Sequence, residues 1–190
     1  ARGAVGARVR TVDAVRDCVA RKVPVVHVLS SGFGEVSGEG PGLQSALVEA
    51  LAGGASALIG PNSLGLYSAG HGLCFSDGCH FDPGPVTFIS QSGALCTDVL
   101  AQGQIRGVKF SKVLSVGNCA DLDWPDYVRY CRHDPETGIA VFYIESTSNG
   151  RALYEQLKRL APNKPVLVLT GGQTPAGAPA LASHTGRTAA

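Results

Sequence analysis

Short apolar runs alternate with amphipathic stretches along most of the chain. The runs are rich in β-branched and aromatic residues and are bounded by Gly, Pro and Ser, which predicts buried strands. We expect these strands over residues 23–29, 57–59, 86–89, 110–116, 138–144 and 165–169. Apolar residues at helical spacing predict helices over residues 11–21, 44–51, 94–102, 123–131 and 151–160. The alternation of strands and helices predicts an α/β fold.

Residues 66–85 interrupt this pattern. They have no strong period and contain Gly, Asp and Pro, so we interpret them mainly as a connector at a domain boundary, with room for a short hairpin. A second series, of four strands and three helices, begins at Val86. Because a helix joins each strand to the next, these strands should be parallel, with right-handed crossovers. Their carboxyl ends then share one edge, where such sheets bind ligands.

That edge holds the turn Ser90-Gln91-Ser92-Gly93, which joins a predicted strand directly to a predicted helix. Ser90 or Ser92 can cap this helix. The first backbone N–H groups of a helix have no partner within it, and the helix dipole makes the spot positive, so the turn is a candidate anion site. The same edge also holds residues 117–121, Glu145 and residues 171–174.

Composition narrows the class of protein. The chain has 190 residues, of which 44% are hydrophobic, as in globular proteins. No apolar run approaches the roughly 20 residues that a membrane helix requires. The formal net charge is +1 and Lys and Arg do not cluster, which argues against binding to nucleic acid. No secretory or other targeting segment is evident, so we expect a cytoplasmic protein without a membrane partner.

The six cysteines form no CxxC pair. Cys74, Cys79 and His80 are close in sequence, but no second pair completes a zinc-type set, so we expect no metal site. Reduced cysteines, some packed as small hydrophobic side chains, are the interpretation that suits a cytosolic protein. The chain contains no Met and stops soon after Ser183-His184-Thr185-Gly186, so we also interpret it as part of a longer protein.

Six short motifs follow one another along the chain. They are Ser-Gly-Phe-Gly-Glu at 31–35, Gly-Pro-Asn-Ser-Leu-Gly at 60–65, Ser-Gln-Ser-Gly at 90–93, Ser-Val-Gly-Asn at 115–118 with Asp121, Tyr-Ile-Glu at 143–145 and Ser-His-Thr-Gly at 183–186. The series closely resembles the nucleoside-diphosphate-forming (NDP-forming) acyl-CoA synthetases, also called ADP-forming acetate–CoA ligases, which are related to the α subunit of succinyl-CoA synthetase. Each motif alone is weak, but their common order is specific.

The resemblance implies a fold and a domain order. Residues 1–66 would be the C-terminal part of a Rossmann-like CoA-binding domain, and residues 67–85 the connector. Residues 86–190 would be a truncated flavodoxin-like ligase domain of the succinyl-CoA-synthetase type, with a parallel sheet. An ATP-grasp domain, in the same chain or another, would bind ATP or ADP with Mg²⁺. We therefore expect the chain to act within an oligomer and to be inactive alone.

The implied reaction interconverts acyl-CoA, phosphate and NDP with carboxylic acid, CoA and NTP through a phosphohistidine. His184 aligns with the phosphorylated histidine, and a neutral imidazole is a good nucleophile near pH 7 because its ordinary pKa is ~6.5. Glu145 aligns with the glutamate that hydrogen-bonds this histidine and fixes its tautomer. The phosphoryl oxygens would bind at Ser90, Ser92, Gly93 and Ala94.

Asn62 and Gly65 belong to the implied loop between the domains, near the site. Relatives often carry a cysteine where this chain has Ser63, a departure that does not threaten phosphoryl transfer. The other histidines match no motif and receive no role: His27, His71, His80 and His133.

Three other functions receive less support. A serine hydrolase would need G-x-S-x-G, but Phe88 and Ser90 stand where its first glycine is required. A flavodoxin-like flavin binder would need an aromatic-bearing loop after the phosphate turn, which is lacking. Related ligase-like modules also occur as non-catalytic, regulatory parts of bacterial protein acetyltransferases, some without the histidine. The presence of His184 and Glu145 favours the ligase, and the regulatory module is kept as the alternative.

Overall fold

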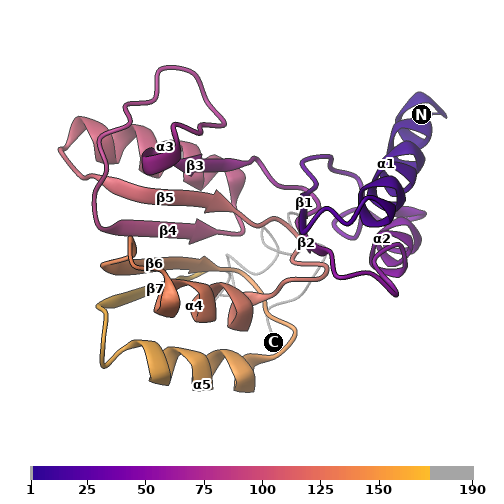
Figure 1. Cartoon of the computed structure of the whole chain (residues 1–190). Coiled ribbons are helices and arrows are strands. Elements are labelled where there is room, and N and C mark those ends of the chain that lie inside the picture. Colours follow the sequence, from indigo (N-terminus) through magenta and orange to yellow (C-terminus); the bar gives the residue numbers. More distant parts are fainter. Residues whose placement is uncertain (1, 172–190) are drawn as a thin grey trace. The chain divides into compact units, whose positions relative to one another are not determined.

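The computed structural model describes residues 2–171, and the contacts divide this part of the chain into two compact units. Among the described residues, the first unit consists of residues 2–63 and 117–122, and the second of residues 64–116 and 123–171 (Figure 1). The chain therefore enters the second unit, returns to the first and enters the second again. None of the helices within residues 2–171 is long and apolar enough to cross a bilayer.

The described part of the first unit contains two helices and two strands: α1 (Arg2–Ala20), β1 (Val25–His27), α2 (Gly40–Glu49) and β2 (Ala57–Ile59). β1 and β2 pair in parallel, and the helices pack against each other. The core is filled by Val12, Val15, Val28, Phe33, Leu47, Leu51 and Leu58. α1 begins well before the predicted residue 11, because residues 2–10 contain no proline and are rich in alanine and arginine, which favour helix. α2 also begins earlier than predicted, with Pro41 in its first turn.

The second unit is built on a five-stranded sheet with the strand order β3-β5-β4-β6-β7. Four of the strands are parallel, as predicted: β4 (Val86–Ser90), β5 (Phe110–Ser115), β6 (Ile139–Ile144) and β7 (Val166–Thr170). They are joined by α3 (Gly93–Ile105), α4 (Trp124–His133) and α5 (Gly150–Leu160). β4 lies in the middle of the sheet, between β5 and β6, which confirms the α/β class with a mainly parallel sheet.

β3 (Leu66–Ser68) lies in the stretch predicted mainly as a connector, yet it runs antiparallel to β5 at the edge of the sheet. A short 3₁₀ helix, η1 (Ala69–His71), follows it. Tyr67 is fully buried, stacks on Phe81 and donates a hydrogen bond to the His80 carbonyl (2.7 Å). A strand of this length is too short for alternation to be detected, which is why the sequence pattern missed it.

Side chains of the central strands alternate between the two faces of the sheet. Phe88 of β4 and Val141 of β6 belong to one core cluster with Leu100 of α3. Phe142 points to the other face, where its ring meets that of Trp124 of α4 edge to face at 6.0 Å. α5 packs beside α4 (Figure 1). The central strands are thus buried on both faces, as nearly continuous apolar runs predict.

Residues 117–122, which follow β5, complete the first unit rather than the second. The Asn118 N–H donates to the Pro61 carbonyl (2.9 Å). Asp121 Oδ2 accepts the Leu58 N–H of β2 (2.8 Å). The segment therefore follows a strand of the second sheet, as predicted, but these hydrogen bonds join it to β2 and the loop after β2 in the first unit.

The loop after η1 contains a disulfide between Cys74 and Cys79. The expectation that all cysteines are reduced is wrong for this pair, because the loop turns back and brings the two Cα atoms to 6.6 Å. Cys96 and Cys131 are buried thiols. Burial raises the pKa of each to about 12, so neither is poised to act as a nucleophile.

Limited proteolysis tests the connector predicted at residues 67–85, which the contacts place inside the second unit. Residues 76–82 are mostly exposed, whereas β3 is held in the sheet. Limited proteolysis of the chain by subtilisin should therefore cut within residues 76–82 first and leave residues 86–169 intact, as mass spectrometry of the fragments would show. Earlier cleavage within β5 would contradict a boundary before Val86.

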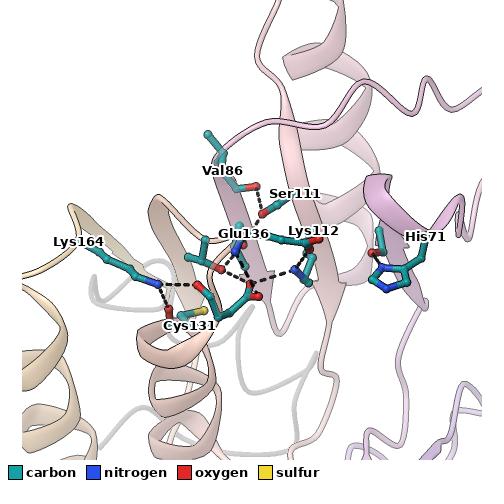
Figure 2. A network of polar contacts seen from close by, with 11 residues as sticks. His71, Val86, Ser111, Lys112, Cys131, Glu136 and Lys164 are labelled. Carbon is teal, nitrogen blue, oxygen red and sulfur yellow. Dashed lines mark hydrogen bonds and ion pairs between the residues drawn. The ribbon is translucent and has the colours of Figure 1, made fainter.

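A buried polar network crosses the second unit at the amino ends of its parallel strands (Figure 2). Asp134 Oδ2 accepts hydrogen bonds from Lys112 Nζ (2.9 Å) and Thr137 Oγ1 (2.6 Å). The Thr137 hydroxyl lies 2.8 Å from that of Thr87, which in turn lies 2.7 Å from that of Ser111. The network joins the starts of β4, β5 and β6 to the C-terminal end of α4.

Burial and hydrogen bonding act against each other on the charges of this network. The side chains of Lys112 and Asp134 are only 11% and 8% exposed. Burial tends to raise the pKa of Asp134, but hydrogen bonds from Thr137 and Lys112 outweigh it, so the pKa is lowered from 3.8. Burial tends to lower the pKa of Lys112, but Glu136 and Asp134 raise it to about 12. Both groups therefore stay charged near neutral pH.

We expect Asp134→Ala to lower the free energy of unfolding by about 3 kcal/mol, because it leaves the buried Lys112 with only the more exposed Glu136. Because the folded pKa of Asp134 is lowered, its contribution is present above 3.8 and is lost as the pH falls through the folded pKa. Urea denaturation followed by the fluorescence of Trp124, the single tryptophan, measures the loss, with the exposed Asp98→Ala as control. A difference between wild type and Asp134→Ala that stays constant into acid would contradict the assignment.

Candidate active site

The turn between β4 and α3 has the geometry expected of an anion site. Ser92 is the N-cap of α3, and its Oγ accepts the Leu95 N–H (3.3 Å). Ser90 is fully buried and uses its hydroxyl inside the turn, accepting from Ser92 N (3.0 Å) and donating to Ser92 O (2.9 Å). The N–H groups of Gly93 and Ala94 lie in the first helical turn, where no carbonyl of the helix can accept them. These two N–H groups, rather than the Ser90 hydroxyl, suit an anion.

Gln91, between the two serines, links this turn to the end of β6. Its N–H donates to the Tyr143 carbonyl (3.2 Å), which adds one step to the β4–β6 ladder. Its Oε1 accepts the N–H groups of both Glu145 (2.6 Å) and Ser146 (2.9 Å). Gln91 is 5% exposed, so these hydrogen bonds are shielded from water.

Glu145 is the first residue beyond β6 and is only 6% exposed. The Tyr143 hydroxyl lies nearby, since a Cβ built on Gly171 would be 2.7 Å from the Tyr143 Oη and 3.4 Å from the Glu145 Cγ. Any side chain at position 171 would therefore press on Tyr143. Burial raises the pKa of Tyr143, and the charge of Glu145 and a hydrogen bond with it add to the rise. The phenol thus stays protonated beside the carboxylate.

The loop after Glu145 is held by the start of α4. Asp123, the N-cap of α4, accepts on Oδ2 from Thr147 Oγ1 (3.1 Å), Ser148 N (2.9 Å) and Ser148 Oγ (2.6 Å). The indole N–H of Trp124 donates to the Ser146 carbonyl (3.0 Å). Residues 146–148 are therefore fixed by α4, whereas the N–H groups of residues 145 and 146 are fixed by Gln91.

A second polar cluster lies in the first unit and gathers residues from three of the six motifs. Asn118 Nδ2 donates to Glu35 Oε2 (2.6 Å) and Gln44 Oε1 (2.9 Å), and Asn62 Nδ2 donates to Asn118 Oδ1 (3.3 Å). Burial tends to raise the pKa of Glu35, but hydrogen bonds from Asn118 and from backbone N–H groups, including that of Phe33, lower it. The charged carboxylate thus joins loops that are far apart in sequence.

The residues of the Gly-Pro-Asn-Ser-Leu-Gly motif divide between the two units. Asn62 takes part in the cluster of the first unit, whereas the Gly65 carbonyl accepts the Ser115 N–H (3.0 Å) in the second. The Ser63 hydroxyl lies 2.6 Å from His27 Nε2, so a histidine that matched no motif contacts a motif residue. Asn62 and Gly65, predicted as one loop near the site, therefore belong to different units.

Two predicted parts of the site lie outside residues 2–171: His184 and residues 172–174. Among the described residues, no group of three or more His, Cys, Asp or Glu side chains is placed to hold a metal ion. The structure does bring together Ser92, Gly93 and Glu145, because Gln91 joins the turn to the end of β6.

Sequence reasoning assigned no role to Gln91, Tyr143 or Asp123. Gln91 and Tyr143 lie inside recognised motifs. The signal for Gln91 is a large polar side chain among small turn residues, and the signal for Tyr143 is a hydroxyl on the same face of β6 as Glu145. Asp123 precedes Trp124-Pro125-Asp126, a pattern that predicts a capped helix but not what else the cap would hold.

Residues 83–190, more than half of the chain, match the protein family described as the succinyl-CoA ligase like flavodoxin domain. The chain belongs to this family. The matched region begins just before β4, so it contains the whole parallel part of the sheet together with Gln91 and Glu145.

Comparison with individual proteins confirms the resemblance to acetate–CoA ligases. Acetate–CoA ligase (ADP-forming) I of Archaeoglobus fulgidus is 38% identical over 175 residues, which are 91% of this chain and 25% of the relative. Subunit α of acetate–CoA ligase (ADP-forming) I of Pyrococcus furiosus is 35% identical over 173 residues, 90% of this chain and 37% of the relative.

Solved structures agree in fold. The dinucleotide forming acetyl-coenzyme A synthetase 1 of Ca. Korarchaeum cryptofilum, in complex with phosphate and ADP, superposes with a TM-score of 0.87 at 33% identity. The superposition covers 96% of this chain and 40% of that one. The chain thus spans between 25% and 40% of the length of these relatives.

We expect Asp123→Ala to lower the free energy of unfolding by about 2 kcal/mol, since it removes a helix cap and leaves the Ser148 N–H without its acceptor. Amide hydrogen exchange should speed up at residues 146–148 in the variant. The same urea titration and exchange measurements test this, with Asp77→Ala in an exposed loop as the matched control. Unchanged exchange at residues 146–148 would show that Asp123 does not hold the loop.

Proposed function

We propose that the chain is the phosphoryl-transfer part of an ADP-forming acyl-CoA ligase, an acid–thiol ligase. The whole enzyme would interconvert acyl-CoA, phosphate and ADP with a carboxylic acid, CoA and ATP. The observation that carries the proposal is the pair of hydrogen bonds that Gln91 Oε1 accepts from the N–H groups of Glu145 and Ser146. Through them, the turn before α3, which is the candidate anion site, also holds the main chain of Glu145. Relatives named ADP-forming acetate–CoA ligases, which match 90% or more of the chain, support the reaction class.

His184 would be the nucleophile of this reaction. Phosphate first displaces the CoA thiolate from acyl-CoA and gives an acyl phosphate. A ring nitrogen of His184 then attacks the phosphorus, the bond from phosphorus to the acyl oxygen breaks, and the carboxylate leaves. A terminal phosphate oxygen of ADP finally attacks the phosphohistidine, the P–N bond breaks, and ATP forms. Every step is reversible.

The described residues would support these transfers in distinct ways. The N–H groups of Gly93 and Ala94, at the positive end of α3, would bind the phosphoryl oxygens, with Ser90 and Ser92 shaping the turn. Glu145 would accept the N–H of the second ring nitrogen of His184, which fixes the tautomer and stabilises the cationic phosphohistidine.

The proposal includes partners that this chain does not supply by itself. CoA, acyl-CoA and phosphate are the proposed small ligands, and an ATP-grasp domain in the same or another chain would bind ADP or ATP. Mg²⁺ bound there would neutralise the charge of the nucleotide phosphates. Two comparisons support this: one relative is named as a subunit α, and the Korarchaeum structure is a complex with phosphate and ADP.

The proposal keeps the cytoplasmic location and the domain division that we expect from the sequence. We place the enzyme in the cytoplasm as an oligomer. Residues 1–66 would contribute to CoA binding, with Asn62 and Gly65 near the site, residues 67–85 would connect, and residues 86–190 would carry the phosphohistidine. The regulatory module of a protein acetyltransferase is not favoured, because the relatives reported above are named as ligases or synthetases.

We expect His184→Asn in the full-length protein to abolish the acid-labile label left by γ-³²P-ATP, because the nucleophile is lost. Glu145→Gln should keep the label but slow its appearance by about 10- to 100-fold, the usual loss when a group that orients a histidine is removed. Rapid-quench labelling with alkaline gel analysis measures both.

The exposed His133→Asn is the matched control and should label like wild type. Acid-labile label that persists on His184→Asn would place the phosphohistidine elsewhere. Absence of any label on the wild type would overturn the proposed function and favour the regulatory module.

A further inference from the structure

We infer that Gln91 is a positioning residue for the phosphoryl transfer, and that it acts through Glu145. Its amide oxygen holds the main chain of Glu145 and so sets the direction in which the Glu145 side chain leaves it. The inference rests on the proposed function, because it assumes that Glu145 orients His184.

The first observation is the way the β4–β6 ladder ends. The last backbone step is the hydrogen bond from Gln91 N to Tyr143 O (3.2 Å). Beyond it, β6 has ended, yet the N–H groups of Glu145 and Ser146 are still close to β4. Buried N–H groups need acceptors, and an amide oxygen offers two lone pairs. Gln91 Oε1 takes both donors at 2.6 and 2.9 Å, so the side chain continues the ladder where the backbone cannot.

The second observation is that these two hydrogen bonds fix the backbone on both sides of the Glu145 Cα atom. One N–H belongs to Glu145 and the other to the next residue, so the peptide planes that flank the side chain are both held. Tyr143 and Gly171 border the carboxylate from the ends of β6 and β7. Because Gln91 and Glu145 are 5% and 6% exposed, water does not replace the lost acceptor easily.

The third observation is that the loop after Glu145 has other hydrogen bonds, so a change at Gln91 can alter the position of Glu145 without unfolding the loop. Asp123 and Trp124 hold residues 146–148 independently of Gln91. The loop should therefore stay in place when Gln91 is changed, while the direction of the Glu145 side chain is no longer fixed.

Gln91→Met in the full-length protein tests this, because methionine has a similar length and volume but no oxygen. We expect labelling of His184 to slow by about 10- to 100-fold, the loss typical of a misplacement of ~1 Å, with the apparent affinity for ATP unchanged. Gln102→Met, an exposed glutamine of α3, is the matched control and should label like wild type. Gln91→Asn, which keeps the amide but withdraws its oxygen, is a second variant should Gln91→Met fold poorly.

A double-mutant cycle with Glu145→Gln decides whether Gln91 acts through Glu145. If it does, Gln91→Met adds no more than about a twofold loss in the Glu145→Gln background, since coupled residues are not additive. Amide exchange at Glu145 and Ser146 should speed up in Gln91→Met and not in Glu145→Gln. Multiplicative losses, or a full rate in both Gln91 variants, would overturn this inference and leave the proposed function intact. Loss of label in the wild type would overturn both.

Discussion

Two backbone N–H groups just beyond β6 need an acceptor inside the protein, and the geometry of the carboxyl edge follows from how that need is met. The acceptor is a side-chain oxygen of the turn that starts α3, so the cap of a helix and the end of a neighbouring strand are fixed by one residue. β4 lies between β5 and β6, and both faces of the sheet are covered, which keeps water away from these hydrogen bonds. A carboxylate and a helix N-terminus are thereby held at the same edge of the sheet.

The edge formed by the amino ends of the same strands is held together in a different way. There the charges of Lys112 and Asp134 neutralise each other in a chain of hydroxyl groups that ties three strands to α4 (Figure 2). Its members already satisfy one another, so this edge contributes stability. At the carboxyl edge, no carbonyl of α3 can accept the N–H groups of Gly93 and Ala94, and there we propose that the phosphoryl oxygens bind.

Local signals in the sequence were enough for the parallel part of the fold. Strands β4 to β7, the cap at Ser92 and the place of Glu145 at the strand ends all follow from period, breakers and capping residues within a few positions. The early helix starts and the Cys74–Cys79 disulfide are local differences, whereas two other differences depend on partners distant in sequence. β3 is a strand only because β5 is beside it, and Asn118 reaches a glutamate 83 positions earlier. The motif resemblance identified the loops that matter but not the hydrogen bonds that join them.

The return of residues 117–122 to the first unit has a consequence for synthesis of the chain. On the ribosome an N-terminal domain usually folds first, as soon as its own residues have emerged. Here the polar cluster of Glu35 with Asn118, and the hydrogen bond from the Leu58 N–H to Asp121, cannot form until β4, α3 and β5 have also been translated. The two units therefore fold at overlapping times and not one after the other. A gene fusion or split made at Ser63 would separate Asn118 from the rest of this cluster and Asp121 from Leu58.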